Sequence, residues 1–191
     1  GQPFYRTDTD QLKIYDGASW DVMGPGAMSI KSVTTVSTDN SGDIVIEPSK
    51  LYKVIIALTN ISADDTVALR FNSNSTNNYE VFRDGVNTIG AVAATRTGVT
   101  ATSGTLGPMD AGTARKKSLI AELLIDTNQV DVSSAKVIGQ VYSFQAAGAA
   151  EFVKVSIDFT VSVTIADFEI LATGASNMTG KVYVYEFALS A

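Results

Sequence analysis

Regular alternation of apolar and polar residues runs through most of this chain and restricts its fold more than any other feature. The clearest example is a stretch near residue 155, where apolar and polar side chains alternate: Val153, Lys154, Val155, Ser156, Ile157, Asp158. A period of two places alternate side chains on opposite faces of a β-strand, so one face of this segment faces a core. Helical periodicity is almost absent elsewhere, and we expect a nearly all-β protein.

Segments of this kind, each ended by turn-forming residues, predict ten strands. Turn signals such as Asn40-Ser41-Gly42 separate them at intervals that suit antiparallel pairing. The strands are predicted at residues 28–36, 43–46, 51–59, 66–71, 79–82, 119–125, 136–144, 152–163, 167–172 and 181–189. We therefore predict a jelly-roll-like antiparallel β-sandwich over residues 27–191, preceded by a small β-meander over residues 1–26 that ends in a hinge at Gly24-Pro25-Gly26.

The N-terminal meander is too small to fold by itself. Its apolar contacts come from a few side chains, among them Phe4, Leu12, Ile14 and Trp20. Two or three short strands bury too little apolar surface to offset the entropy lost when the chain is ordered. We therefore expect the meander to dock on the sandwich or on a neighbouring copy of the chain.

The same segment contains a recognisable pattern, Tyr5-Arg6-Thr7-Asp8-Thr9, then Leu12, Tyr15-Asp16-Gly17 and Trp20. This pattern resembles a segment common in tailed-bacteriophage virion proteins, especially head fibres, capsid decoration proteins and tail appendages. The resemblance implies a structural protein on the outside of a virion that is assembled in the host cytoplasm as a homo-oligomer, namely a trimer. Its partners would be phage capsid or tail proteins, with Tyr5, Tyr15 and Trp20 as candidate contact residues.

A second segment, from Leu69 to Tyr79, contains Arg70-Phe71-Asn72 followed by a run of Ser, Thr and Asn. It resembles a turn of phage β-sandwich domains, although Ser73 to Thr76 replace the usual Gly and Asp. The side-chain amides of Asn74 and Asn77 can close the turn locally, or they can recognise carbohydrate together with Tyr79. The alternative function is therefore a tail-associated receptor-binding module for host-surface glycans.

Composition excludes several kinds of chemistry. The 191 residues include no Cys and no His, which removes disulfides, thiolate metal sites and His-dependent catalysis. A formal net charge of −6 disfavours binding to nucleic acid, and no apolar run approaches the ~20 residues that span a bilayer. Asp8 and Asp10 alone do not make a calcium loop. We expect no enzymatic activity, no metal or other cofactor, and no membrane insertion.

Residues 83–117 contain no aromatic side chain and are rich in Gly, Ala and Thr. We predict a long loop here, either a flexible excursion with one weak strand at Gly90 to Ala94 or an arm that lies along a neighbouring subunit. Arg115, Lys116 and Lys117 close this segment and can pair with acidic residues of a partner.

Two further patterns carry expectations about side-chain placement. In the last strand, Tyr183, Tyr185 and Phe187 alternate with smaller side chains, and we expect this aromatic face to pack into the core, with a platform for sugar rings as the alternative. Asp64-Asp65 follows a strand, so we expect its carboxylates to accept hydrogen bonds from backbone amides in a turn.

Overall fold

The structure is a computed structural model that describes residues 3–6, 11–15, 20–22, 28–87, 95–111, 118–127, 135–144 and 150–187. All regular secondary structure in these residues is β-strand. None of the described residues belongs to a helix able to cross a membrane. The predicted all-β class is therefore confirmed.

The described residues form fifteen strands. Their bounds are β1 Pro3–Arg6, β2 Gln11–Tyr15, β3 Trp20–Val22, β4 Met28–Val36, β5 Ile44–Val45, β6 Leu51–Ile61, β7 Asp65–Phe71, β8 Tyr79–Asn87, β9 Thr95–Ala101, β10 Gly104–Met109, β11 Ser118–Asp126, β12 Ala135–Phe144, β13 Ala150–Phe159, β14 Asp167–Ala172 and β15 Met178–Phe187.

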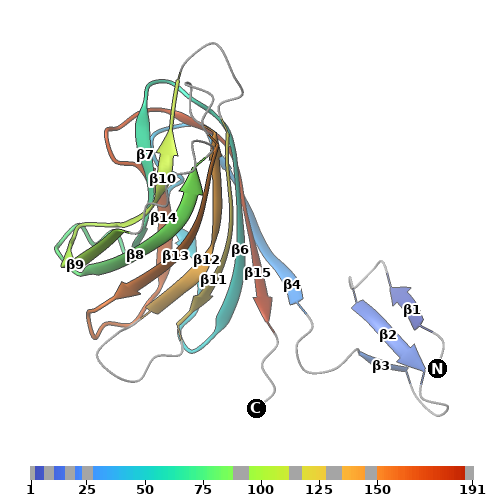
Figure 1. The fold of residues 1–191 in the computed structure, drawn as a ribbon. Helices are drawn as coiled ribbons and strands as arrows, with labels where there is room; N and C mark the ends of the chain where they lie inside the picture. The colour runs from blue at the N-terminus through green and yellow to red at the C-terminus, as the bar shows by residue number, and fades with distance from the viewer. Residues whose placement is uncertain are drawn as a thin grey trace.

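Pairing joins these strands into three antiparallel sheets. A large sheet has the order β4-β15-β6-β11-β12-β13-β8-β9, a small sheet has the order β10-β7-β14-β5, and β1-β2-β3 form a meander. The small sheet lies against one face of the large one (Figure 1), where β10 contacts β8, β11, β12 and β13. These two sheets make the predicted sandwich, and the meander is a separate sheet whose strands pair with each other.

The core fills the space between the two sheets. Alternate residues of β6 point into it, so Tyr52, Val54, Ile56 and Leu58 are buried. On the other side, the ring of Phe159 lies 5.6 Å from the ring of Phe71 and 4.9 Å from the ring of Tyr79, measured between centroids. The contact between Phe159 of β13 and Phe71 of β7 joins the large sheet to the small one, whereas Tyr79 is the neighbour of Phe159 within the large sheet.

The predicted strands recur in the structure, and two of them have the predicted bounds. Residues 28–36 coincide with β4, and residues 167–172 coincide with β14. Other strands differ at their ends. The strand predicted at 152–163 ends at Phe159, and the strand predicted at 79–82 continues to Asn87. Strand ends differ because pairing with a neighbour, which local sequence does not encode, determines where a ladder stops.

The prediction of a long loop over residues 83–117 is wrong. This segment contains the end of β8, all of β9 and all of β10. Its small residues permit close packing instead of disorder: a Cβ added to Gly104 would lie 2.7 Å from Cδ1 of Ile157. Leu106 and Met109 of β10 are fully buried in the core. The weak strand predicted at residues 90–94 lies outside the described residues, and so does the predicted hinge at residues 24–26.

An ionic network ties the first and last strands of the sandwich together. The Nζ atom of Lys31 lies 2.7 Å from Glu47 and 3.2 Å from Glu186, and Nζ of Lys50 lies 3.1 Å from Glu186. Burial opposes ionisation of Glu186, but hydrogen bonds from Lys50 and Lys31 outweigh it and lower the pKa of this carboxyl below its ordinary value. The network fixes β4 beside β15 at the edge of the large sheet.

Candidate functional site

The face of the large sheet that points away from the small sheet, called the outer face below, carries most of the exposed large apolar side chains of the described residues. Eight of these ten side chains lie on it. These eight are Met28, Ile30, Val33, Phe82, Val86, Ile120, Ile138 and Tyr142. Exposed apolar side chains gathered on one face are characteristic of a site that contacts another molecule.

Strand register aligns apolar residues across four strands of the outer face. Ile120 lies opposite Tyr142, Tyr142 lies opposite Phe152, and Phe152 lies opposite Val86. We call these four residues the apolar row. The rings of Tyr142 and Phe152 pack with centroids 4.8 Å apart. Ile120 is 46% exposed and Val86 is 50% exposed, so the row is open to solvent at both ends.

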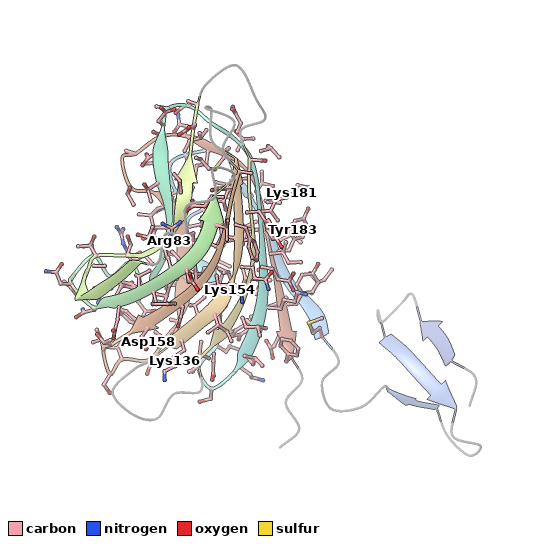
Figure 2. All side chains as sticks on the ribbon, viewed as in Figure 1. Arg83, Lys136, Lys154, Asp158, Lys181 and Tyr183 are labelled. Carbon is pink, nitrogen blue, oxygen red and sulfur yellow. The ribbon has the colours of Figure 1, made fainter. Side chains whose placement is uncertain are left out.

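A polar row crosses the same strands two residues further along. Glu122 of β11 lies opposite Gln140 of β12, which lies opposite Lys154 of β13. Glu122 forms an ion pair with Lys53 of β6, with Oε1 of Glu122 and Nζ of Lys53 2.6 Å apart. Lys154, shown in Figure 2, has no ion-pair partner among the described residues. The row ends on β8 at Asp84, which lies opposite Lys154. The formal charge is therefore negative, neutral, positive and negative across four neighbouring strands.

A shallow depression of about 410 Å³ lies in the centre of the outer face. Its walls include Glu122, Gln140 and Lys154, and Gly139 lies within it. A Cβ at Gly139 would lie only 2.2 Å from the carbonyl oxygen of Glu122. A residue with a side chain at position 139 would therefore force the backbones of β11 and β12 to move.

The tyrosines of the last strand also belong to the outer face, which corrects the expectation that they fill the core. Val182 and Val184 are buried, whereas Tyr183 and Tyr185 are half-buried on the opposite side of β15. The register places Val184 opposite Val54, whose side chain is in the core, and this fixes which side of β15 faces inward. The phenol groups remain near solvent, where Figure 2 labels Tyr183.

The candidate contact residues of the meander lie on strands. Tyr5 is on β1 opposite Leu12, and Tyr15 is on β2 opposite Trp20, the first residue of β3. The structure thus brings Tyr15 and Trp20 together as cross-strand neighbours, while their side chains lie outside the described part. The basic cluster of Arg115, Lys116 and Lys117 also lies outside the described residues.

The asparagine-rich turn closes on itself. Oδ1 of Asn74 accepts hydrogen bonds from the backbone amide of Thr76 at 2.9 Å and from its hydroxyl at 2.6 Å. The hydroxyl of Tyr79 accepts a hydrogen bond from the amide of Phe71 at 2.8 Å. Burial raises the pKa of Tyr79 to about 12. Turn closure therefore uses Asn74, and Tyr79 is a core residue and not the predicted surface contact, whereas Asn77 is exposed.

Asp64 and Asp65 have the predicted turn role. Oδ1 of Asp64 accepts a hydrogen bond from the amide of Ala111 at 2.6 Å. The carboxylate of Asp65 accepts hydrogen bonds from the amides of Gly174 at 2.8 Å and Ser176 at 3.1 Å. These bonds tie the start of β7 to the loop before β15. The described residues contain no cluster of three or more acidic side chains arranged to hold a metal ion.

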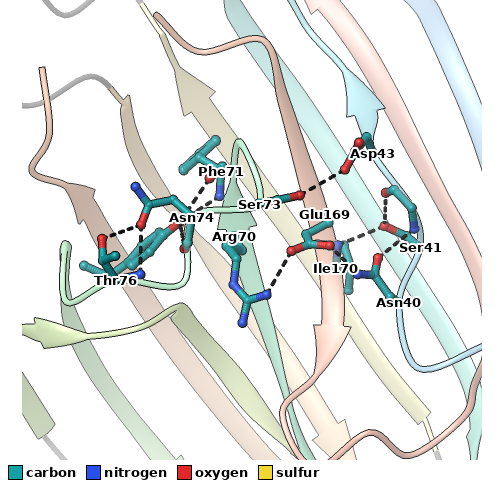
Figure 3. A network of polar contacts seen from close by, with 12 residues as sticks. Asn40, Ser41, Asp43, Arg70, Phe71, Ser73, Asn74, Thr76, Glu169 and Ile170 are labelled. Atoms are coloured by element: carbon teal, nitrogen blue, oxygen red, sulfur yellow. Dashed lines mark hydrogen bonds and ion pairs between the residues drawn. The ribbon is translucent and has the colours of Figure 1, made fainter. Parts of the chain in front are cut away.

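A buried polar cluster on the small sheet was not predicted. Glu169 of β14 is only 3% exposed. Its carboxylate pairs with Nη1 of Arg70 on β7 at 3.1 Å and accepts a hydrogen bond from the side-chain amide (Nδ2) of Asn40 (Figure 3). Nearby, burial and then the charge of Asp43 raise the pKa of Asp167. A single Glu in the apolar sequence Phe168-Glu-Ile-Leu171 was the available signal, because a charge inside such a run needs a buried partner.

Comparison with known proteins gives little. No family model matches the chain, and no curated protein matches it. Among solved structures, the chain is similar to the structure of infectious bursal disease virus Gt strain, with 11% identity, a TM-score of 0.22, and coverage of 92% of this chain and 46% of that chain. The chain thus spans about half the length of that protein. A similarity of this size defines neither a shared fold nor a shared function.

Proposed function

We propose that this chain is a structural protein of a bacteriophage virion, a capsid decoration or head-fibre subunit that binds the outside of the particle and associates with further copies of itself. The observation that carries the proposal is the outer face, where exposed apolar side chains gather over neighbouring strands of one sheet. Surfaces of this kind are stable in water when a partner covers them. An assembled particle supplies such partners permanently.

The meander gives the proposal a second support. Its strands pair with each other and not with the strands of the sandwich. Three strands of three to five residues cannot bury a core of their own, so they need a surface to dock on. The N-terminal resemblance to phage virion proteins agrees with attachment of this segment to a capsid or tail protein.

The chemistry of the Asn-rich turn does not favour the alternative of a glycan-binding tail module. Asn74 uses its side-chain oxygen to close the turn, and Tyr79 is buried with its hydroxyl on the backbone of Phe71. Sugar recognition needs polar groups that are free to bond hydroxyl groups of the ligand. Of the three residues predicted for that role, Asn77 is the exposed one.

Uptake by capsids tests the proposal. Phage capsids assembled without this chain are incubated with increasing amounts of recombinant protein, and bound protein is measured after sedimentation. We expect binding that saturates at a fixed number of copies per capsid. A variant that begins at residue 28 and lacks the meander should bind less, because the docking segment is missing.

Two results would count against the proposal. One is a recombinant protein that binds neither capsids nor tails at any concentration. The other is a specific signal on a glycan array that Asn77→Ala abolishes, which would favour the receptor-binding alternative.

A further inference from the structure

We propose that the outer face is the contact between two copies of this chain, related by a two-fold axis that runs along β12. This inference deepens the self-association in the proposed function and rests on it. Two sheets that pack face to face through the same surface must be related by an axis lying in the plane of contact. The residues on the outer face indicate which direction in that plane the axis takes.

The polar row selects an axis parallel to the strands. Such an axis along β12 exchanges the positions of β11 and β13, because these are the two neighbours of β12. Glu122 of one copy then faces Lys154 of the second copy, and Lys154 faces Glu122. Two equivalent pairs of opposite charge form, and Lys154, which has no ion pair among the described residues, gains one. Asp84, at the β8 end of the row, faces Ile55 of the second copy.

The apolar row fits the same axis. Tyr142 faces Tyr142 of the second copy, and Ile120 faces Phe152 of the second copy. One strand further out, β6 faces β8, so Ala57, which lies opposite Ile120 in the sheet, meets Val86 of the second copy. Every member of the row is apolar on both sides of the axis, and the exposed area of each is removed from water.

An axis perpendicular to the strands fits less well. If it passed through the polar row, Glu122 would face Glu122 and Lys154 would face Lys154 of the second copy. Like charges in direct contact cost several kcal/mol and exclude that arrangement. At the far end of the strands, Lys136 lies opposite both Asp126 and Asp158 of its own sheet, and Figure 2 shows Lys136 and Asp158 there. The axis along β12 brings Asp126 of one copy toward Asp158 of the second copy at the rim, with Lys136 of each copy between them.

The size of the face is near the lower limit for a specific contact. Five strands from β6 to β8 span roughly 24 Å at ~4.8 Å per strand. The apolar row, the polar row and the residues beyond them extend about 20 Å along the strands, which gives a flat footprint of roughly 500 Å². Side-chain relief adds to this figure, and each partner in a standard stable interface buries about 800 Å² of accessible surface.

The two-fold contact also restricts the number of copies of the chain in the assembly. By itself it gives a dimer. If the chain also forms the trimer that its N-terminal resemblance implies, the contact joins two trimers into six copies. An even number of copies is expected in both cases.

Charge reversal tests the contact in the full chain. Glu122→Lys and Lys154→Glu are each measured by analytical ultracentrifugation over a range of concentrations, together with the double variant. We expect each single variant to weaken association about tenfold or more, because two like-charge contacts replace two ion pairs. The double variant restores the opposite pairing and should recover most of the loss.

A matched pair of apolar variants provides an independent measurement. Ile138 on the outer face is 56% exposed and Val45 on the small sheet is 67% exposed. We expect Ile138→Glu to halve the mass of the assembly, whereas Val45→Glu should leave it unchanged. Both positions are exposed, and circular dichroism confirms that the variants remain folded.

Three outcomes would overturn the inference: a monomer at all concentrations, an odd-numbered assembly whose mass Ile138→Glu does not change, or single reversals that the double variant fails to rescue. Capsid uptake is measured separately for each variant. Normal saturation with any of these outcomes would remove the two-fold contact and leave the proposed virion role standing. Loss of uptake by the wild-type chain would remove that role.

Discussion

The two sheets of the sandwich differ in how far their charged and apolar side chains find partners within the chain. On the small sheet, the buried carboxylate of Glu169 is paired with Arg70 and with the side-chain amide of Asn40, although Nε of Arg70 and Oδ1 of Asp167 are buried without a hydrogen-bond partner. The large sheet leaves Lys154 without an ion pair among the described residues, next to a row of exposed apolar side chains. Polar groups that are already paired have little to offer a partner, whereas exposed apolar groups gain from one.

The contrast predicts which face contributes to folding and which to assembly. Substitutions in the polar cluster of the small sheet should lower the stability of the monomer. Substitutions of exposed side chains on the outer face should change association and leave the unfolding free energy nearly constant. The following experiments test this division, beginning with the largest expected effect.

Removal of Arg70 should cause the largest loss. Arg70→Ala leaves the carboxylate of Glu169, which is 3% exposed, without its cation, and we expect the unfolding free energy to fall by about 3 to 5 kcal/mol. Urea denaturation of the monomer measures the change. The double variant Arg70→Met with Glu169→Leu should be more stable than Arg70→Ala, because no buried charge is left unpaired. A loss below about 1 kcal/mol for Arg70→Ala would show that water reaches Glu169.

Adding a methyl group at Gly139 should cause the second largest loss of stability. Gly139 lies on the large sheet, so a loss of folding stability here is an exception to the division between folding and assembly. Its Cβ would lie 2.2 Å from the carbonyl oxygen of Glu122 and 2.9 Å from Cα of Leu123, so the backbone must move. We expect Gly139→Ala to cost about 2 to 3 kcal/mol in the same denaturation experiment. At Gly107 the nearest atom is 3.6 Å away, which makes Gly107→Ala the matched control with an expected cost below ~1 kcal/mol. Equal costs at both positions would contradict the close approach of β11 and β12.

The smallest effect is a dependence on pH at Asp65. Burial opposes its ionisation, but hydrogen bonds from the amides of Gly174, Thr66 and Ser176 together outweigh burial and lower its pKa below the ordinary value of 3.8. A carboxyl with a lowered pKa in the folded state stabilises the protein above its unfolded pKa and loses that contribution as pH falls through the folded pKa. The wild type should therefore be more stable than Asp65→Asn by about 1 kcal/mol at pH 7, with the difference shrinking below pH 4. A difference that stays constant down to pH 2 would show that ionisation is not involved.

Alternation along the chain predicted the presence of most strands, and the turn residues between them predicted some of the strand ends. The bounds of β4 and β14 were predicted to the residue. β9 and β10 were missed because Gly, Ala and Thr give a weak local signal, and the burial of Leu106 and Met109 beneath the large sheet stabilises β10 from outside its own sequence. Tertiary packing outweighs local propensity in strands of this kind.

The elements of the candidate site were present in the sequence, but their arrangement was not. Alternation showed that Lys154 points away from the core, and similar reasoning applies to Glu122. Their placement in one row depends on β11, β12 and β13 being neighbours in register, which is a property of the sheet. The same reason explains Tyr183, since the sequence shows two faces of the last strand and only the pairing of Val184 with Val54 shows which face is inward.

The amino-acid sequence alone determined that this protein is an all-β sandwich with a small N-terminal meander, because a period of two is encoded residue by residue. It also excluded His- and Cys-dependent chemistry through composition. The tertiary structure decided which face of the large sheet remains open and which charges lie next to each other on it. Strand order is a long-range outcome of packing between segments far apart in the chain, and no local pattern records it.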